Sequence, residues 1–437
     1  MLRRRAVHLR RSPAPVLTTD GPAILAGMRD KVGARDSYIT DPAVESAPMR
    51  RRQAAPIFVA MLLLGALIIR VALLPLTAGN DFRAFDILAA LSLHGHDVYA
   101  LRMTHRLGTL PWTYFPLLLH MFAALQWVAM HTGWPFRVLG KLPIVAADLA
   151  VGLLIYTALR RRGRGEGVAL CGMALYLYNP FVLYNGAFYG RFDAIALAFL
   201  LLALESYRTR LFALAYALAI AAKTFPLFLL PLLALGRDRQ PPRRLILACV
   251  LVPLLALPEI VTDPRGLLAI FDYVRPNFGR LSWYYFPLET HLLSEAHVFQ
   301  LARTLMWLYP VSLLLLLRGS LYVKAAGCFV LYLIFNQVVY EQYLLWPLPF
   351  LIVVGLHERD RLALWLAVLL TVAGMLENEY TWEPHVYLHY HLAPTPWWPL
   401  NVAVAVSCVA FVAQVSRKSI VESRKKRGAS RALSTNA

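Results

Sequence analysis

The chain has 437 residues, of which 59% are apolar and 16% are charged, and its mean hydropathy is +0.54. A soluble domain has about 45–50% apolar and about 25% charged residues, so this composition excludes a disordered chain and argues against a soluble multidomain enzyme. The apolar residues recur in runs of about 15–22, which is typical of membrane-spanning helices.

The net charge of +19 is carried mainly by the two ends of the chain. Residues 1–52 hold eleven Lys or Arg and five acidic residues, and residues 416–437 hold seven and one, so the ends supply twelve of the nineteen charges. Basic segments beside apolar runs mark the cytoplasmic side of a membrane protein and do not require a nucleic-acid partner. We therefore expect a disordered basic cytoplasmic extension over 1–54, a transmembrane domain over 55–415 and a basic cytoplasmic tail over 416–437.

The predicted fold is an all-α polytopic membrane bundle of about 12 transmembrane helices, some of them short enough to be tilted or broken. The predicted spans are 55–76, 142–159, 168–185, 192–205, 211–222, 224–236, 243–261, 298–317, 321–336, 343–356, 362–376 and 397–415. Basic clusters such as Arg160-Arg161-Arg162 fall in the turns that this order places in the cytoplasm. Two long outer loops are expected, over 77–141 and 262–297.

Residues 112–130 are also apolar enough to cross a membrane. A crossing there would place Arg160 outside and would break the charge rule for the rest of the chain. We therefore predict a helix that lies along the outer membrane surface, where Trp112, Tyr114 and Trp127 suit the interface.

Charged residues beside the apolar runs are informative because a charge at the centre of a membrane helix costs about 2.5–3.5 kcal/mol on insertion scales. Residues of both signs gather at the predicted outer ends of the spans. They are Asp81, Arg191, Asp193, Lys223 and Glu341, and the neutral Gln342 stands beside them. Acids and bases that converge on one apolar membrane face predict a cavity for a phosphate headgroup and a sugar.

Each of these residues also has a structural explanation. Arg191 and Asp193 would pair with each other at a helix end, Lys223 would extend its charge to the interface, and Asp81 would cap the helix that it begins. Asp148, inside the span 142–159, is expected to serve helix packing.

The order of short motifs along 75–415 is the strongest pattern in the sequence. The motifs are Asn80-Asp81-Phe82-Arg83-Ala84-Phe85, Thr113-Tyr114-Phe115-Pro116-Leu117, Gly140-Lys141-Leu142, Gly190-Arg191-Phe192-Asp193-Ala194, Lys223-Thr224-Phe225-Pro226 and Gln342-Tyr343-Leu344-Leu345-Trp346. In this order they resemble the membrane glycosyltransferases of the GT-C superfamily, in particular the GPI mannosyltransferase I family and bacterial polyprenyl-phosphate-mannose-dependent mannosyltransferases.

The resemblance implies an inverting mannosyltransferase of a plasma membrane, in bacteria the inner membrane. It would move a hexose from a polyprenyl-phosphate sugar to a lipid-linked or glycan acceptor on the outer face. The superfamily carries its acidic catalytic residue in the first outer loop, which corresponds to Asp81 here. A second acid is common in that loop, and Asp86 is the nearest candidate, without an assigned role.

The remaining site residues follow from the chemistry of such a transfer, in which cations neutralise the departing phosphate and polar or aromatic groups bind the sugar. The candidates for donor phosphate and sugar binding are Arg191, Asp193, Lys223, Arg275, Arg280, Glu341, Gln342 and Tyr343. No cofactor is required, and a divalent metal shared by Asp81 and Asp193 is the less favoured alternative. A lipid or solute transporter and a non-catalytic subunit of a glycosylation complex are the competing functions.

Overall fold

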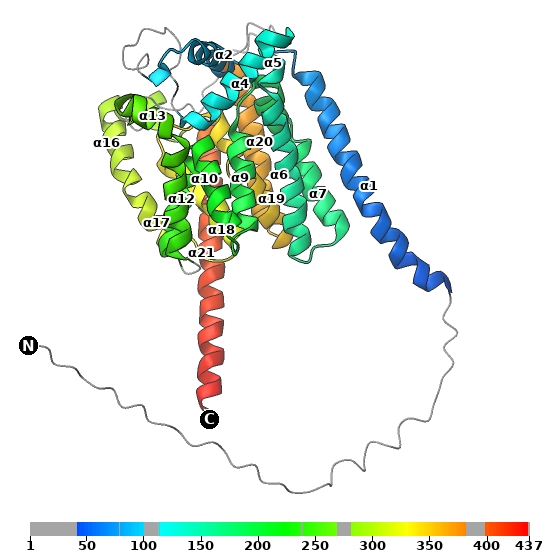
Figure 1. Ribbon diagram of the computed structural model, residues 1–437. Helices are drawn as coiled ribbons and strands as arrows, with labels where there is room; N and C mark the ends of the chain where they lie inside the picture. The colour runs from blue at the N-terminus through cyan, green and yellow to red at the C-terminus, as the bar shows by residue number, and fades with distance from the viewer. Residues whose placement is uncertain are drawn as a thin grey trace, which may run out of the picture. The chain divides into compact units, whose positions relative to one another are not determined.

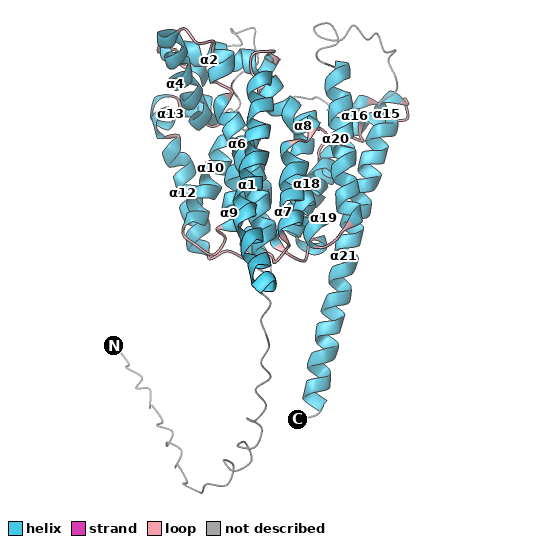
Figure 2. Cartoon of the chain, turned by 90° about the vertical axis from the view of Figure 1, so that its right-hand side faces the viewer, coloured by secondary structure: helices cyan, strands magenta, loops and turns pink. Residues whose placement is uncertain are grey.

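The computed structural model describes residues 42–77, 79–99, 112, 114–236, 239–268, 281–381 and 398–435. The chain divides into two compact units, residues 1–54 and residues 55–437, and everything below concerns the second. Within the described ranges every regular element is a helix, as Figure 2 shows. The prediction of an all-α protein is thus confirmed for the described residues.

The helices follow one another in short segments. In the first half of the chain they are α1 (Pro42–Leu73), α2 (Asn80–Leu93), α4 (Pro116–Thr132), α5 (Phe136–Leu139), α6 (Leu142–Arg161), α7 (Glu166–Leu177), α8 (Pro180–Leu183), the π-helix η1 (Tyr184–Tyr189), α9 (Asp193–Glu205) and α10 (Leu211–Ala222). In the second half they are the 3-10 helix η2 (Phe225–Leu229), α11 (Leu230–Leu235), α12 (Pro242–Leu255), α13 (Leu257–Thr262), α14 (Pro264–Leu268), α15 (Tyr285–Glu289), α16 (Glu295–Met306), α17 (Leu308–Leu316), α18 (Leu321–Phe335), the 3-10 helix η3 (Glu341–Leu345), α19 (Leu348–His357), α20 (Arg361–Thr381) and α21 (Trp398–Thr435). Each predicted apolar segment overlaps one helix or two consecutive helices, except 168–185, which overlaps α7, α8 and η1.

Among the described residues, three helical stretches are long and apolar enough to cross a membrane, namely Ala55–Leu73, Phe136–Arg161 and Trp398–Lys418. Two pairs of helices bent by 46° and 41° raise this number to five if each pair is one span. The other apolar helices are short; α10, for example, has 12 residues, whereas about 20 residues cross the hydrocarbon core. The predicted count of about 12 crossings therefore stays a prediction.

The helices of the predicted first outer loop lie together at one end of the bundle, as Figures 1 and 2 both show for α2 and α4. The contact between them is aromatic: the rings of Phe85 in α2 and Phe122 in α4 stack with centroids 5.5 Å apart. The helix predicted over 112–130 is thus present as α4. Its orientation along a membrane surface stays a prediction.

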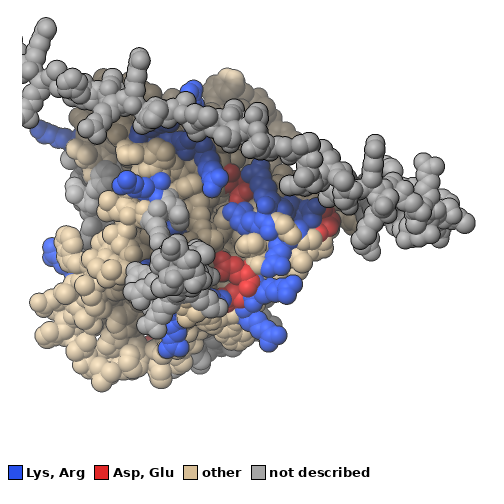
Figure 3. Space-filling model, turned by 90° about the horizontal axis from the view of Figure 1, so that it is seen from below, with Lys and Arg blue, Asp and Glu red and all other residues tan. Residues whose placement is uncertain are grey.

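The opposite end of the bundle is basic. The last turn of α6 carries Arg160 and Arg161, the turn before α7 carries Arg162 and Arg164, and Figure 3 shows Lys and Arg side chains gathered on this face.

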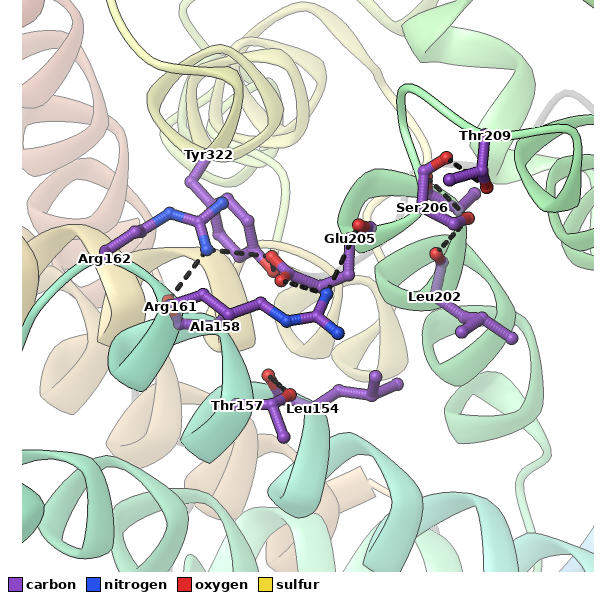
Figure 4. A network of polar contacts seen from close by, with 11 residues as sticks. Leu154, Thr157, Ala158, Arg161, Arg162, Leu202, Glu205, Ser206, Thr209 and Tyr322 are labelled. Atoms are coloured by element: carbon purple, nitrogen blue, oxygen red, sulfur yellow. Dashed lines mark hydrogen bonds and ion pairs between the residues drawn. The ribbon is translucent and has the colours of Figure 1, made fainter.

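One buried carboxylate organises part of this face. Arg162 Nη1 lies 2.8 Å from Glu205 Oε1, Arg161 Nη1 lies 3.3 Å from Glu205 Oε2, and the Tyr322 hydroxyl donates to Glu205 over 2.9 Å (Figure 4). These contacts join the ends of α6, α9 and α18. The basic turn follows the last residue of α6, whereas α4 and α5 of the predicted first outer loop precede its first residue.

A buried ion pair attaches α1 to the bundle. Arg70 is fully buried although most of Ala55–Leu73 is exposed. Arg70 Nε lies 3.2 Å from Asp148 Oδ2 in α6, and Arg70 Nη1 donates to the Leu177 carbonyl over 3.0 Å. The structural role expected for Asp148 is thus the one that the structure shows, whereas the partner Arg70 was not foreseen.

We predict that Asp148→Asn destabilises the protein strongly, because the variant keeps the shape of the side chain but leaves the Arg70 charge buried without its counter-ion. Removing one partner of a buried pair costs about 3–5 kcal/mol. The measurement is the free energy of unfolding in detergent. The double variant Arg70→Met/Asp148→Asn should recover part of the loss, and an equal or larger loss in the double variant would contradict a role in ion pairing.

Candidate active site

The start of α2 is fixed against the end of η1 by close backbone contact. The Gly79 N–H donates to the Tyr189 carbonyl over 2.9 Å, and a Cβ on Gly79 would lie 2.1 Å from the Tyr189 ring. Gly190 has a φ of 92°, a conformation that favours glycine, and a Cβ there would lie 2.5 Å from the Phe82 ring. Only glycine fits at these two positions, and the close approach brings Asp81 next to Arg191.

Arg191 is the centre of the site. Its side chain is 7% exposed, and its Nε lies 3.7 Å from Asp81 Oδ2. The guanidinium also forms an ion pair with Glu341 and a hydrogen bond to the Gln342 side-chain oxygen, both in η3. It lies over the Tyr189 ring, 4.6 Å from the centroid. Arg191 therefore connects α2 to η3, which begins 150 residues after Arg191 itself in the chain.

A second buried pair lies on the neighbouring helix ends. Lys223 Nζ, just after α10, lies 2.8 Å from both carboxylate oxygens of Asp193, the first residue of α9. The Trp346 indole N–H donates to Asp193 Oδ1 over 2.7 Å. The alternative in which Arg191 pairs with Asp193 is therefore wrong, because each has a different partner. The alternative in which Lys223 extends to the interface is also wrong, because the ammonium is buried on a carboxylate.

Aromatic rings enclose the Lys223 ammonium. The centroids of Phe192, Tyr114 and Trp346 lie 5.3, 5.6 and 6.0 Å from Nζ. Tyr343, predicted to bind the sugar, stacks on Trp346 with centroids 4.2 Å apart. These rings provide apolar faces beside the charged groups, which is the usual composition of a ligand site.

Asp81 differs from the other carboxylates of the site in being accessible. Its side chain is 30% exposed, whereas those of Glu341 and Asp193 are 2% and 1% exposed. The 3.7 Å to Arg191 Nε is too long for a hydrogen bond, so the Arg191 charge orients the carboxylate without occupying its oxygen. Asp81 lies inside the first turn of α2, where Gly79 is the capping residue. This arrangement leaves a carboxylate that can accept a proton from a bound molecule.

Asp86, the other acid of α2, faces a different neighbour. Burial raises the pKa of its carboxyl group, and a hydrogen bond with Gln126 of α4 acts in the opposite direction. These contacts connect Asp86 to the packing of α2 on α4.

The structure thus brings together seven of the nine predicted site residues, namely Asp81, Arg191, Asp193, Lys223, Glu341, Gln342 and Tyr343. Arg275 and Arg280 lie outside the described residues. Among the residues that are described, no group of three His, Cys, Asp or Glu side chains has the arrangement of a metal site. Trp346 and Lys141 have roles that were not predicted, although both stand in the short motifs noted in the sequence.

Comparison with known proteins finds similarity over part of the chain. No protein-family model matches the chain. Over 161 residues the chain is 31% identical to the GPI mannosyltransferase 1 of the fungus Gibberella zeae, which is 36% of this chain and 34% of that protein. The chain therefore spans about a third of the length of the curated relative that it matches. Over this stretch it is similar to a mannosyltransferase, in agreement with the resemblance of its motifs.

Proposed function

We propose that the protein is a membrane mannosyltransferase that moves a mannosyl group from a polyprenyl-phosphate sugar to a lipid-linked or glycan acceptor. The observation that carries the proposal is the accessible Asp81 carboxylate, set 3.7 Å from the buried Arg191 at one end of an apolar helix bundle. The partial similarity to a GPI mannosyltransferase supports the same class of reaction.

In the proposed reaction Asp81 accepts the proton of the acceptor hydroxyl. The hydroxyl oxygen forms a bond to the anomeric carbon of the sugar. The bond from that carbon to the phosphate oxygen breaks, and the polyprenyl phosphate leaves with the electron pair. Attack opposite to the leaving group inverts the anomeric configuration.

The departing phosphate would need positive charge beside it. Arg191 and Lys223 are both paired already, with Glu341 and Asp193. Each of these pairs has no net charge, so Arg191 and Lys223 are proposed to act on the phosphate as parts of fixed dipoles in a desolvated site. Arg275 and Arg280 of the second outer loop are proposed to complete the phosphate site.

We expect Asp81→Asn to lower turnover by a factor of about 10²–10⁴, the usual contribution of general-base catalysis, because the amide cannot accept the proton. The assay is sugar transfer in detergent from polyprenyl-phosphate mannose. Arg83→Gln changes an exposed charge on the same helix and serves as the matched control with unchanged turnover.

Near-normal transfer by the Asp81→Asn variant would contradict the catalytic assignment. Failure of the wild-type protein to transfer any polyprenyl-phosphate sugar in detergent would instead favour transport, because transport needs a sealed bilayer.

The role of Lys223 is tested by comparing Lys223→Met and Asp193→Asn with the double variant. Each single variant leaves a buried charge unpaired, so both should unfold at lower temperature, and the double variant should regain stability. If Lys223 also contributes charge to the donor phosphate, the double variant keeps a donor KM raised by a factor of about ten or more. A double variant with both wild-type stability and wild-type donor KM would show that Lys223 serves folding alone.

The site is proposed to face the outside, on the grounds of the basic turn at the other end of the bundle. In a variant without native cysteines, Thr132→Cys should react with an impermeant thiol reagent on intact cells. Gly165→Cys should react only after permeabilisation. The reverse result would place the site on the cytoplasmic side, and labelling of both from outside would contradict a crossing by α6.

A further inference from the structure

Lys141 is a fully buried cation at the start of α6. Its ammonium lies within hydrogen-bond distance of four main-chain carbonyl oxygens. The Nζ–O distances are 2.5 Å to Thr77, 2.7 Å to Phe188, 3.2 Å to Leu74 and 3.2 Å to Ala187. We call these four carbonyl oxygens the cage. A lysine ammonium has three N–H donors, so the cage has more acceptors than the ammonium has hydrogens.

The four oxygens come from two helix ends and the turn that follows one of them. Leu74 is the residue after α1, and Ala187 and Phe188 lie in the last turn of η1. The last carbonyl groups of a helix have no partner within the helix, and they carry the negative end of its dipole. The carboxyl ends of α1 and η1 both face the Lys141 ammonium, and together they favour a cation at that position.

No carboxylate pairs with Lys141 among the described residues, which distinguishes it from Arg70, Arg191 and Lys223. Its charge is balanced by carbonyl dipoles and by the Phe82 ring, whose centroid lies 5.7 Å from Nζ. In potassium channels, main-chain carbonyl oxygens replace the water around K⁺ and no carboxylate is needed. The surroundings of Lys141 are thus those of a monovalent cation.

We propose that these four carbonyls form a monovalent-cation site that the protein fills with its own lysine ammonium, and that the site accepts K⁺ or NH₄⁺ when the side chain is removed. The cation holds the end of α1 and the end of η1 together. Asp81 follows the first of these ends and Arg191 follows the second, so Lys141 is a positioning residue for both. The inference concerns stability and stands whether or not the protein transfers a sugar.

The test is the thermal unfolding of purified Lys141→Ala in detergent at constant ionic strength. The salts compared are KCl, NH₄Cl and N-methylglucamine chloride, whose cation is too large for the cage. We expect a lowered unfolding temperature in N-methylglucamine chloride and a saturable recovery with K⁺ or NH₄⁺. The wild-type protein should unfold at the same temperature in all three salts.

Two variants control for other causes. Lys141→Met fills the space with an apolar chain and should stay destabilised in every salt. Arg83→Ala removes an exposed positive charge from α2 without opening a cage, and it should show no preference among the salts.

The proposal is overturned if Lys141→Ala unfolds at the same low temperature in all salts, or if it matches the wild-type protein in N-methylglucamine chloride. A K⁺ effect of equal size in the wild-type protein or in Arg83→Ala would also overturn it, as a general salt effect. Failure of Lys141→Ala to fold in KCl counts against it too, because an exchangeable cation would fill the cage.

Discussion

A charge inside an apolar bundle is tolerated only when another group of the protein balances it, and this constraint shapes the whole molecule. Asp148 balances Arg70, Asp193 balances Lys223, and Glu341 balances Arg191. The Arg70–Asp148 and Arg191–Glu341 pairs join segments that are 78 and 150 residues apart in the sequence, whereas Lys223–Asp193 joins the consecutive helices α9 and α10. The charges therefore fix which helix ends meet, in a bundle where apolar packing alone specifies little about the identity of neighbours.

The same constraint separates the structural charges from the candidate catalytic one. In these three ion pairs each charge contacts its partner and is almost inaccessible to solvent, so the loss of a pair would disturb the fold. Asp81 stands outside them, partly exposed and beyond hydrogen-bond distance of Arg191. The closed pairs provide a fixed field, and the open carboxylate is the group that a substrate would meet first.

The sequence predicts the bounds of a helix well where a charged turn marks the end of an apolar run. The predicted span 142–159 corresponds to α6 (Leu142–Arg161), which ends in the basic turn. The predicted span 168–185 is broken instead, because Asn179 accepts a hydrogen bond from the Phe181 N–H over 2.9 Å and starts a new helix at Pro180. Hydropathy does not register such a cap inside an apolar run.

The sequence predicts which residues belong to the site better than it predicts which of them form ion pairs. Sequence alone collects Arg191, Asp193 and Lys223 at one end of the bundle, since polar residues between apolar runs are conspicuous. Pairing depends on the π-helical end of η1 and on the backbone contact at Gly79, which set the direction of each side chain. The Arg70–Asp148 pair could not be predicted from local sequence, because the two residues are 78 positions apart in different helices.

Helix α9 has a consequence for the depth of the site. It has 13 residues and is held by ion pairs at both ends, through Asp193 at one and Glu205 at the other. At about 1.5 Å per residue its length is about 20 Å, which is less than the roughly 30 Å of the hydrocarbon core. If the basic end lies at one membrane surface and α9 runs perpendicular to it, Asp193 lies about 10 Å short of the other surface. A lipid substrate would then have to draw its phosphate out of the headgroup layer to react, and the first part of its hydrocarbon chain would follow it into the protein.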